Sequence, residues 1–311
     1  MSSLHPQAQA YYERTALQDK DSPEDQLGPV ELRADATARA LELPPGAAVA
    51  SVADFTVMVA DGARLAARRY EPAGARGTIV WLHGGGWVLD GLELSDALCR
   101  TLANESGATV VSVDYRVAPE HRFPVALDDG HDALRWVAVQ IADGEPLIVG
   151  GDSAGGNLAA VCALRARTGG PEILAQVLVY PITDSDLTTP SYLEYGEPEL
   201  LPMLSTDAMA WFFDCYARDA ADLSNAELAP LRTPDLSGAP PAIVVVAEID
   251  PLRDDALHYA QRLRDAGVEV TLLHYERMPH GFFSRPTVFD DGADAIARVG
   301  AQLRELIAAR L

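Results

Sequence analysis

A seven-residue stretch, Gly151 to Asn157, contains a serine with one glycine two positions before it and another two positions after it. The apolar run Leu147–Gly150 predicts a buried strand before this stretch, and Asn157–Arg167 predicts a helix after it. A serine on such a tight strand-to-helix turn has a strained backbone and an exposed hydroxyl, and the helix N-terminus favours negative charge beside it. The pattern predicts Ser153 as the nucleophile of a serine hydrolase.

Three consecutive glycines lie in the segment His83–Trp87, directly after another apolar run typical of a buried strand. Acyl transfer places negative charge on the substrate's carbonyl oxygen, and backbone N–H groups that already point at this oxygen stabilise it. Glycines let the main chain approach a substrate closely, because they carry no side chain. We therefore predict an oxyanion hole formed by the amides of Gly84, Gly85 and Ala154. The alternative is a glycine loop that only caps a helix over Ser95–Ser106.

Two further polar residues follow apolar strand patterns late in the chain. Asp250 comes after Ala242–Ala247, and His280 comes after Val268–Tyr275. Open α/β sheets place their sites at the carboxyl ends of strands, and serine, aspartate, histidine is the chain order of the α/β-hydrolase triad. We therefore predict that His280 takes the proton of Ser153 and that Asp250 orients the imidazole.

Other titratable residues have competing interpretations. Asp254 and Asp255 are alternative triad acids, but they open a predicted helix, where carboxylates favour the positive end of the dipole and act as caps. Asp152 is expected to hydrogen-bond neighbouring loop backbone, and His83 to orient the glycine loop. The remaining histidines show no metal-ligand spacing, so no metal site and no cofactor are predicted. A structural ion-pair cluster is predicted from Asp114, Arg116 and Glu120.

These motifs together resemble the hormone-sensitive-lipase-like family of α/β-hydrolases, over roughly Asp54 to Ala309. The resemblance implies a mostly parallel sheet of about eight strands, flanked by helices and covered by a helical cap. It implies a carboxylesterase with the triad and oxyanion residues named above. The segments that carry it are HGGGW at 83–87, DYRVAPEH at 114–121, GDSAGGN at 151–157, DPLRDD at 250–255 and HGF at 280–282.

Strand and helix patterns alternate over residues 47–183 and 238–311, which predicts the α/β-hydrolase core. Residues 1–46 and 184–237 interrupt this alternation, and the resemblance implies that they form the two parts of the cap. Side chains there and in the glycine loop are candidates for the wall of a substrate pocket, although Trp211 and Phe212 also fit a small core of the cap itself. These candidates are Trp87, Tyr195, Leu201, Met203, Trp211 and Phe212.

The amino-acid composition limits the kinds of molecule that the protein is expected to bind and the compartment expected for it. A formal net charge of −22 would repel nucleic acid and anionic membranes, so a small, uncharged or weakly charged ester is the expected partner. No apolar run is long enough to span a membrane, and the first residues do not resemble a secretion signal. Three widely spaced cysteines favour reduced thiols and a cytoplasmic location over a disulfide framework. The resemblance also implies a possible homodimer through Val268–Tyr275.

Three functional alternatives remain at this point. One triad can serve amides, lactones or carbamates as well as esters. A lipase active at oil–water interfaces is disfavoured, since no large apolar segment stands out. A ligand-binding protein on the same scaffold is disfavoured too, because the receptors that resemble this family lack the histidine that is present here as His280.

Overall fold

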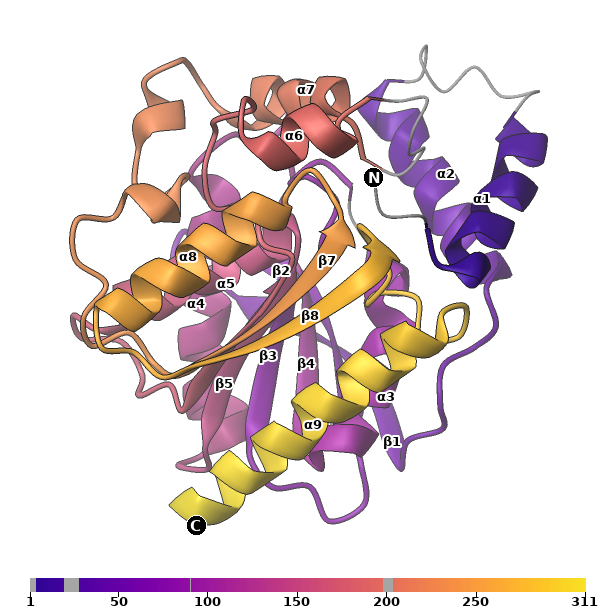
Figure 1. The fold of residues 1–311 in the computed structure, drawn as a ribbon. Coiled ribbons are helices and arrows are strands. Elements are labelled where there is room, and N and C mark those ends of the chain that lie inside the picture. Colours follow the sequence, from indigo (N-terminus) through magenta and orange to yellow (C-terminus); the bar gives the residue numbers. More distant parts are fainter. Residues whose placement is uncertain (1–3, 20–27, 90, 198–203) are drawn as a thin grey trace.

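The computed structural model describes residues 4–19, 28–89, 91–197 and 204–311. Its centre is one eight-stranded sheet with the strand order β1-β2-β4-β3-β5-β6-β7-β8, covered by helices on both faces (Figure 1). β2 runs antiparallel to both of its neighbours, and the other pairs are parallel. The strands are β1 (Ser51–Met58), β2 (Arg64–Glu71), β3 (Thr78–Leu82), β4 (Thr109–Asp114), β5 (Leu147–Asp152), β6 (Ala175–Val179), β7 (Ala242–Ile249) and β8 (Val270–Pro279).

The helices divide between the two faces and the carboxyl end of the sheet. They are α1 (Pro6–Asp19), α2 (Pro29–Glu42), α3 (Asp96–Ser106), α4 (Val125–Val137), α5 (Ala154–Ala166), α6 (Pro190–Tyr195), α7 (Thr206–Tyr216), α8 (Arg253–Asp265) and α9 (Asp290–Arg310). None of the helices in these described ranges is long and apolar enough to cross a membrane.

The central strand β3 shows why the sheet is covered on both sides. All five of its residues are buried, as expected for a parallel strand between two helical layers. Val80 and Leu82 belong to the core that contains residues of α4, α5 and α8. Ile79 and Trp81 point to the opposite core, which contains residues of α3 and α9. The expected α/β-hydrolase architecture, with about eight strands flanked by helices, is therefore confirmed.

The segments outside the strand–helix alternation gather beyond the carboxyl ends of the strands. Figure 1 shows α6 and α7 above β7 and β8, with α1 and α2 beside them. The first pair lies within residues 184–237 and the second within residues 1–46. The division of the chain into a core and a two-part cap stays a prediction, and this placement supports it.

Strand β8 extends beyond the predicted end at Tyr275, as far as Pro279. The last residues of β8 include charged and exposed positions. This is expected because β8 is the terminal strand in the sheet order, so part of its surface faces solvent. The apolar pattern in the sequence therefore stops before the strand ends. The extension matters because it places His280 immediately after the final residue of β8.

The prediction that Asp114, Arg116 and Glu120 form one ion-pair cluster is wrong. Arg116 pairs instead with Asp129 at 2.6 Å and with Asp61 at 2.8 Å. Asp114 accepts a hydrogen bond from the amide of Gly91. Asp114 is the last residue of β4, whereas Arg116 and Glu120 lie beyond the strand, and Glu120 is in a turn, so the three side chains contact different elements.

Glu120 pairs with a residue of the N-terminal segment. Arg33 of α2 lies 2.6 Å from this carboxylate and also donates to the carbonyl oxygens of Val88 and Ala118. The hydrogen bonds from Arg33 hold the pKa of Glu120 well below its usual range. Helix α2 is thereby fixed to the loop that follows the three glycines.

Candidate active site

Ser153 lies at the turn between β5 and α5 in a left-handed backbone conformation, with φ 56° and ψ −119°. Such a conformation is costly for a residue with a side chain, and the surrounding packing must enforce it. A Cβ on Gly155 would overlap the carbonyl oxygen of Leu82, and one on Gly151 would overlap the carbonyl of Gly155. Both motif glycines are therefore required because the elbow presses against β3.

The structure brings the three predicted triad residues together. His280 Nδ1 lies 2.8 Å from Asp250 Oδ2, and His280 Nε2 lies 3.1 Å from Ser153 Oγ. Asp250 is completely buried, and its other oxygen accepts the amide N–H of Leu252 at 2.8 Å. Because an ionised carboxylate can only accept hydrogen bonds, Nδ1 carries the imidazole proton. Nε2 is then free to accept the proton of the serine hydroxyl.

The two alternative acids point elsewhere. Asp255 accepts the amides of Thr183 and Asp184 at 2.8 and 2.9 Å, and Asp254 accepts the amide of Ser191 at 2.9 Å. Both lie in the first turn of α8, as predicted, but neither caps it, since the cap residue makes no side-chain hydrogen bond. Their carboxylates instead tie α8 to the segment that follows β6.

The buried carboxyl of Asp255 predicts a pH-dependent contribution to stability. Burial raises its pKa from 3.8 to about 7, although the two backbone donors oppose the shift. Between these values the unfolded chain binds fewer protons than the folded chain, so wild-type stability falls as the pH rises through this window. Asp255→Asn cannot titrate there. The difference in melting temperature, variant minus wild type, should increase from pH 5 to pH 8 in thermal unfolding, and an unchanged difference would contradict the assignment.

The predicted role of Gly84 as an oxyanion donor is contradicted by its hydrogen bond. Its amide donates to Asp152 Oδ1 at 3.1 Å, so this N–H is already paired within the protein. Asp152 also accepts the hydroxyl of Ser284 at 2.8 Å. Burial raises the pKa of Asp152, and the hydrogen bond from Ser284 opposes that shift. The expectation that Asp152 bonds loop backbone is confirmed.

The amides of the next two glycines are unpaired, as the donors of an oxyanion hole must be. In the described part of the chain, the amides of Gly85, Gly86 and Ala154 have no protein acceptor. Gly85 and Gly86 have φ values of 118° and 60°, which side chains disfavour, and a Cβ on Gly86 would overlap the ring of Phe212. Gly86 was missed, because a run of three glycines does not reveal which amides are already paired.

His83 braces this loop, as expected. Its Nδ1 lies 2.7 Å from the carbonyl oxygen of Gly84, and its ring stacks on Tyr115 with centroids 4.3 Å apart. The hydroxyl of Tyr115 donates to the carbonyl oxygen of His83 at 2.7 Å. The ring is buried beside the loop and makes no hydrogen bond to the triad.

A cavity of about 370 Å³ opens onto Ser153 and His280. Its walls come from the glycine loop, from α2 and from α7, so residues far apart in the sequence enclose the nucleophile. Apolar side chains predominate above the serine, and an ion pair between Asp35 and Arg39 lies at the α2 side. The wall residues include Leu32, Ala36, Ala40, Leu204, Met209, Phe212, Ser284 and Arg285.

Of the predicted wall residues, Phe212 lines this cavity. Trp87 does not, because it is completely buried and stacks on Tyr216 with centroids 4.5 Å apart. Trp211 packs against Phe212 and the core behind it. Leu201 and Met203 lie outside the described residues.

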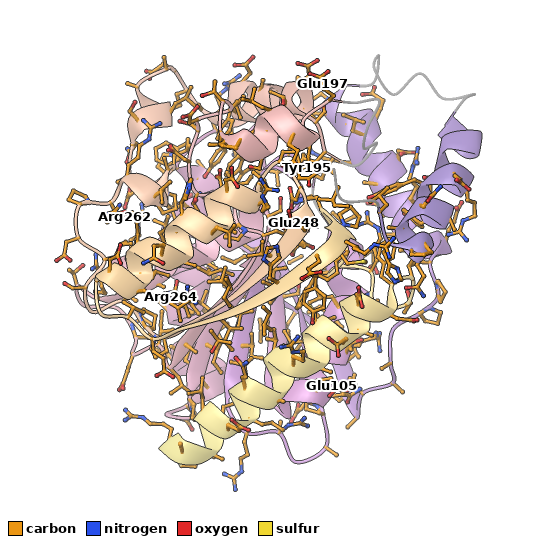
Figure 2. All side chains as sticks on the ribbon, viewed as in Figure 1. Glu105, Tyr195, Glu197, Glu248, Arg262 and Arg264 are labelled. Carbon is orange, nitrogen blue, oxygen red and sulfur yellow. The ribbon has the colours of Figure 1, made fainter. Side chains whose placement is uncertain are left out.

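Tyr195 is also absent from the cavity wall. It is buried on α6, beyond the carboxyl end of β7, where Glu248 lies (Figure 2). The guanidinium of Arg253 lies over its ring at 5.3 Å and pairs with Glu248 at 2.8 Å. Burial raises the pKa of Tyr195 to about 12. Its ring is buried and packs under Arg253, away from the cavity.

The wall formed by α2 was missed, although the sequence holds a signal for it. Leu32, Ala36 and Ala40 recur at a spacing of four residues, which places them on one face of a helix. That face is short and rich in alanine, so its hydrophobic pattern is weak. No local pattern indicates that it covers a cavity instead of a core.

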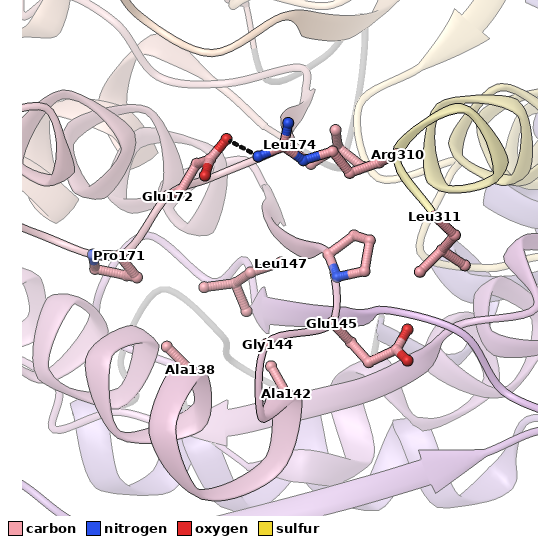
Figure 3. A pocket seen from close by; sticks show the side chains of 11 residues that line it. Ala138, Ala142, Gly144, Glu145, Leu147, Pro171, Glu172, Leu174, Arg310 and Leu311 are labelled. Atoms are coloured by element: carbon pink, nitrogen blue, oxygen red, sulfur yellow. Dashed lines mark hydrogen bonds and ion pairs between the residues drawn. The ribbon is translucent and has the colours of Figure 1, made fainter.

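A second cavity of about 290 Å³ lies at the opposite end of β5, where Leu147 begins the strand. Figure 3 shows an ion pair across it between Glu172 and Arg310. Its described lining contains no serine, cysteine or histidine. Among the residues that the structure describes, no group of three or more His, Cys, Asp or Glu side chains could hold a metal ion. The first cavity is therefore the candidate active site.

Comparisons with known proteins agree with the fold. The family described as having an α/β-hydrolase fold matches residues 79–284. Carboxylesterase NlhH of Mycobacterium tuberculosis is 43% identical over 235 residues, covering 74% of this chain and 73% of that protein. A solved thermostable esterase from Pseudomonas putida has a TM-score of 0.91 at 33% identity, covering 98% of each chain. The chain thus belongs to the α/β-hydrolase superfamily, in its hormone-sensitive-lipase-like family of carboxylic ester hydrolases.

Proposed function

We propose that the chain is a serine carboxylesterase that hydrolyses short- to medium-chain acyl esters. The observation that carries this proposal is the hydrogen-bonded series from Asp250 through His280 to Ser153, which ends at the floor of a cavity. A relative from Pseudomonas putida is named ethyl acetate hydrolase, at 35% identity over 265 residues and 82% of each chain. That name supports a small ester as the substrate class.

Acylation follows from the positions of these groups. The Oγ of Ser153 bonds to the ester carbonyl carbon while His280 Nε2 takes the hydroxyl proton. Asp250 holds the imidazole in the required tautomer and stabilises the imidazolium that forms. The negative oxygen of the tetrahedral intermediate is placed to accept the amides of Gly85, Gly86 and Ala154. The C–O bond to the alcohol then breaks, and Nε2 returns the proton to the leaving oxygen.

Deacylation repeats the cycle with water. His280 takes a proton from the water as its oxygen attacks the acyl carbon, and the same amides stabilise the second intermediate. The bond to Ser153 Oγ breaks and the serine recovers its proton.

The volume of the cavity supports short- to medium-chain acyl groups as substrates. About 370 Å³ is near the lower end of the range typical for ligand pockets, and Phe212 occupies space directly against Gly86. Short and medium acyl groups fit this space better than long ones.

Phe212→Ala should shift specificity toward longer acyl chains, because it removes the aromatic ring next to the oxyanion loop. The ratio of kcat/KM for octanoate over acetate p-nitrophenyl esters is expected to rise by about tenfold, the scale of one or two methylene contacts. Trp211→Ala is the matched control, since Trp211 lies outside the cavity wall. An equal shift in both variants would show that general loosening of α7, and not the wall, sets the preference.

The function is tested by measuring hydrolysis of p-nitrophenyl esters from two to sixteen carbons. Turnover that peaks at short chains supports the proposal, and a maximum at twelve carbons or more would favour a lipase. A fluorophosphonate that labels serine hydrolases should modify Ser153, located by peptide mass spectrometry. Labelling of Ser153 without ester turnover would instead favour amides, lactones or carbamates as substrates.

We also propose a cytoplasmic homodimer. The three cysteines Cys99, Cys162 and Cys215 are buried and free, which fits a reducing compartment. Within the described residues, β8 pairs only with β7, and an open strand edge can pair with a second copy. Light scattering should give twice the chain mass at micromolar concentration, and a monomer would exclude this assembly.

A further inference from the structure

A series of partly buried hydrogen bonds connects the histidine loop, the serine turn and the glycine loop. The hydroxyl of Tyr180 lies 2.8 Å from Ser284 Oγ, which lies 2.8 Å from Asp152 Oδ2. The other oxygen of Asp152 accepts the amide of Gly84 at 3.1 Å. We propose that Ser284 is a positioning residue that holds the oxyanion loop in register with the histidine loop, an inference that rests on the proposed function.

The direction of every proton in this series follows from the chemistry of its members. As a carboxylate, Asp152 can only accept, so Ser284 donates to it and Gly84 donates to its second oxygen. The oxygen of Ser284 then accepts the hydroxyl proton of Tyr180. Tyr180 is 1% exposed and Asp152 is 6% exposed, and both Asp152 and Ser284 border the cavity. Losing one member leaves a buried polar group unpaired, which makes the arrangement rigid.

The members belong to different parts of the machinery. Ser284 lies four residues after His280, Asp152 directly precedes Ser153, and Gly84 begins the glycine loop. Tyr180 also packs against the imidazole of His280, with ring centroids 4.5 Å apart. The series therefore fixes the loop that carries the oxyanion amides relative to both the base and the nucleophile.

Ser284 itself does not reach the reacting hydroxyl, since its proton is committed to Asp152. Its effect must pass through Asp152 and Gly84 to the amides of Gly85 and Gly86. Because these amides act on the charge that develops in the transition state, a displaced loop should lower kcat more than it weakens substrate binding. Ser284 also borders the cavity, and a residue that only contacted substrate would raise KM instead.

The first test is Ser284→Ala, assayed on p-nitrophenyl acetate. We expect kcat to fall by about 10- to 100-fold, the scale of a misplaced catalytic group, with KM within about twofold of wild type. Ser284→Thr keeps the hydroxyl and should recover most of kcat. The rate of fluorophosphonate labelling should fall in parallel, because the phosphoryl oxygen uses the same amides.

Coupling between members is the second test. Tyr180→Phe removes the donor at the far end of the series and should lower kcat by less than Ser284→Ala does. The double variant should lose less than the product of the two single losses, since both act through Asp152. Ser106→Ala is the control, because it removes a buried, hydrogen-bonded hydroxyl from α3, away from the cavity.

The inference is overturned if Ser284→Ala keeps kcat, raises KM alone, or is not recovered by threonine. Independent, multiplicative losses in the double variant would also overturn it. Each of these outcomes leaves the proposed function intact, provided that the wild type hydrolyses the ester. A wild type that neither hydrolyses esters nor reacts with the phosphonate at Ser153 would refute the proposed function itself.

Discussion

Ser153→Ala should lower kcat for ester hydrolysis by about 10⁴- to 10⁶-fold. The variant has no oxygen to form the acyl-enzyme, and His280 has no proton to remove. The cavity walls and the backbone amides are unchanged, so substrate binding should persist. Residual turnover would come from water activated in place of the serine, with the oxyanion amides still available.

Alanine at this position removes the hydroxyl and should leave the rest of the structure unchanged. It keeps a Cβ, so the left-handed backbone at φ 56° is no more strained than with serine. Among the residues that the structure describes, the Ser153 side chain makes a hydrogen bond only with His280 Nε2. The melting temperature should therefore remain close to that of the wild type. A variant that kept more than a tenth of wild-type kcat would exclude Ser153 as the nucleophile.

Asp250→Asn should lower kcat by about 10⁴-fold, because it selects the wrong imidazole tautomer. The amide of Leu252 donates to Asp250 Oδ1, which will hold the asparagine oxygen at that position. The asparagine NH₂ then replaces Oδ2 and faces His280 Nδ1. Nδ1 must become the acceptor, so Nε2 carries the proton and can no longer take one from Ser153.

A matched control for this variant lies five residues along the chain. Asp255→Asn makes the same chemical change at another buried aspartate, whose partners are the amides of Thr183 and Asp184 and not an imidazole. It should retain wild-type kcat. Comparable losses in both variants would assign the effect to the fold around α8, and Asp250 would no longer be the triad acid.

The sequence predicted the hydrogen-bonded contact of Ser153, His280 and Asp250 better than it predicted its surroundings. Ser153 and His280 stand in short segments whose glycines and strand endings restrict the backbone locally, so residue type and order carry most of the information. The partner of the Gly84 amide is Asp152, 68 positions away. No local pattern records such a contact, which is why the first glycine was assigned as an oxyanion donor.

The pocket walls were predicted least well, for a related reason. An aromatic residue next to the glycine loop was expected to face the substrate, but Trp87 has a φ of 61°. This left-handed conformation directs the indole into the core, where it stacks on Tyr216. The small side chains of α2 were overlooked, because alanines give little hydrophobic signal although they leave room for a ligand.

The attachment of α2 by Arg33 has a consequence for exchanging segments between relatives. Helix α2 forms part of the cavity wall, and Arg33 holds it to Val88, just past the oxyanion glycines, and to Glu120. A graft of the N-terminal segment alone would transfer a new wall but break this anchor unless the acceptor keeps its acidic partner. Exchanging α2 alone would therefore change the cavity wall and, at the same time, the position of the loop that carries the glycines.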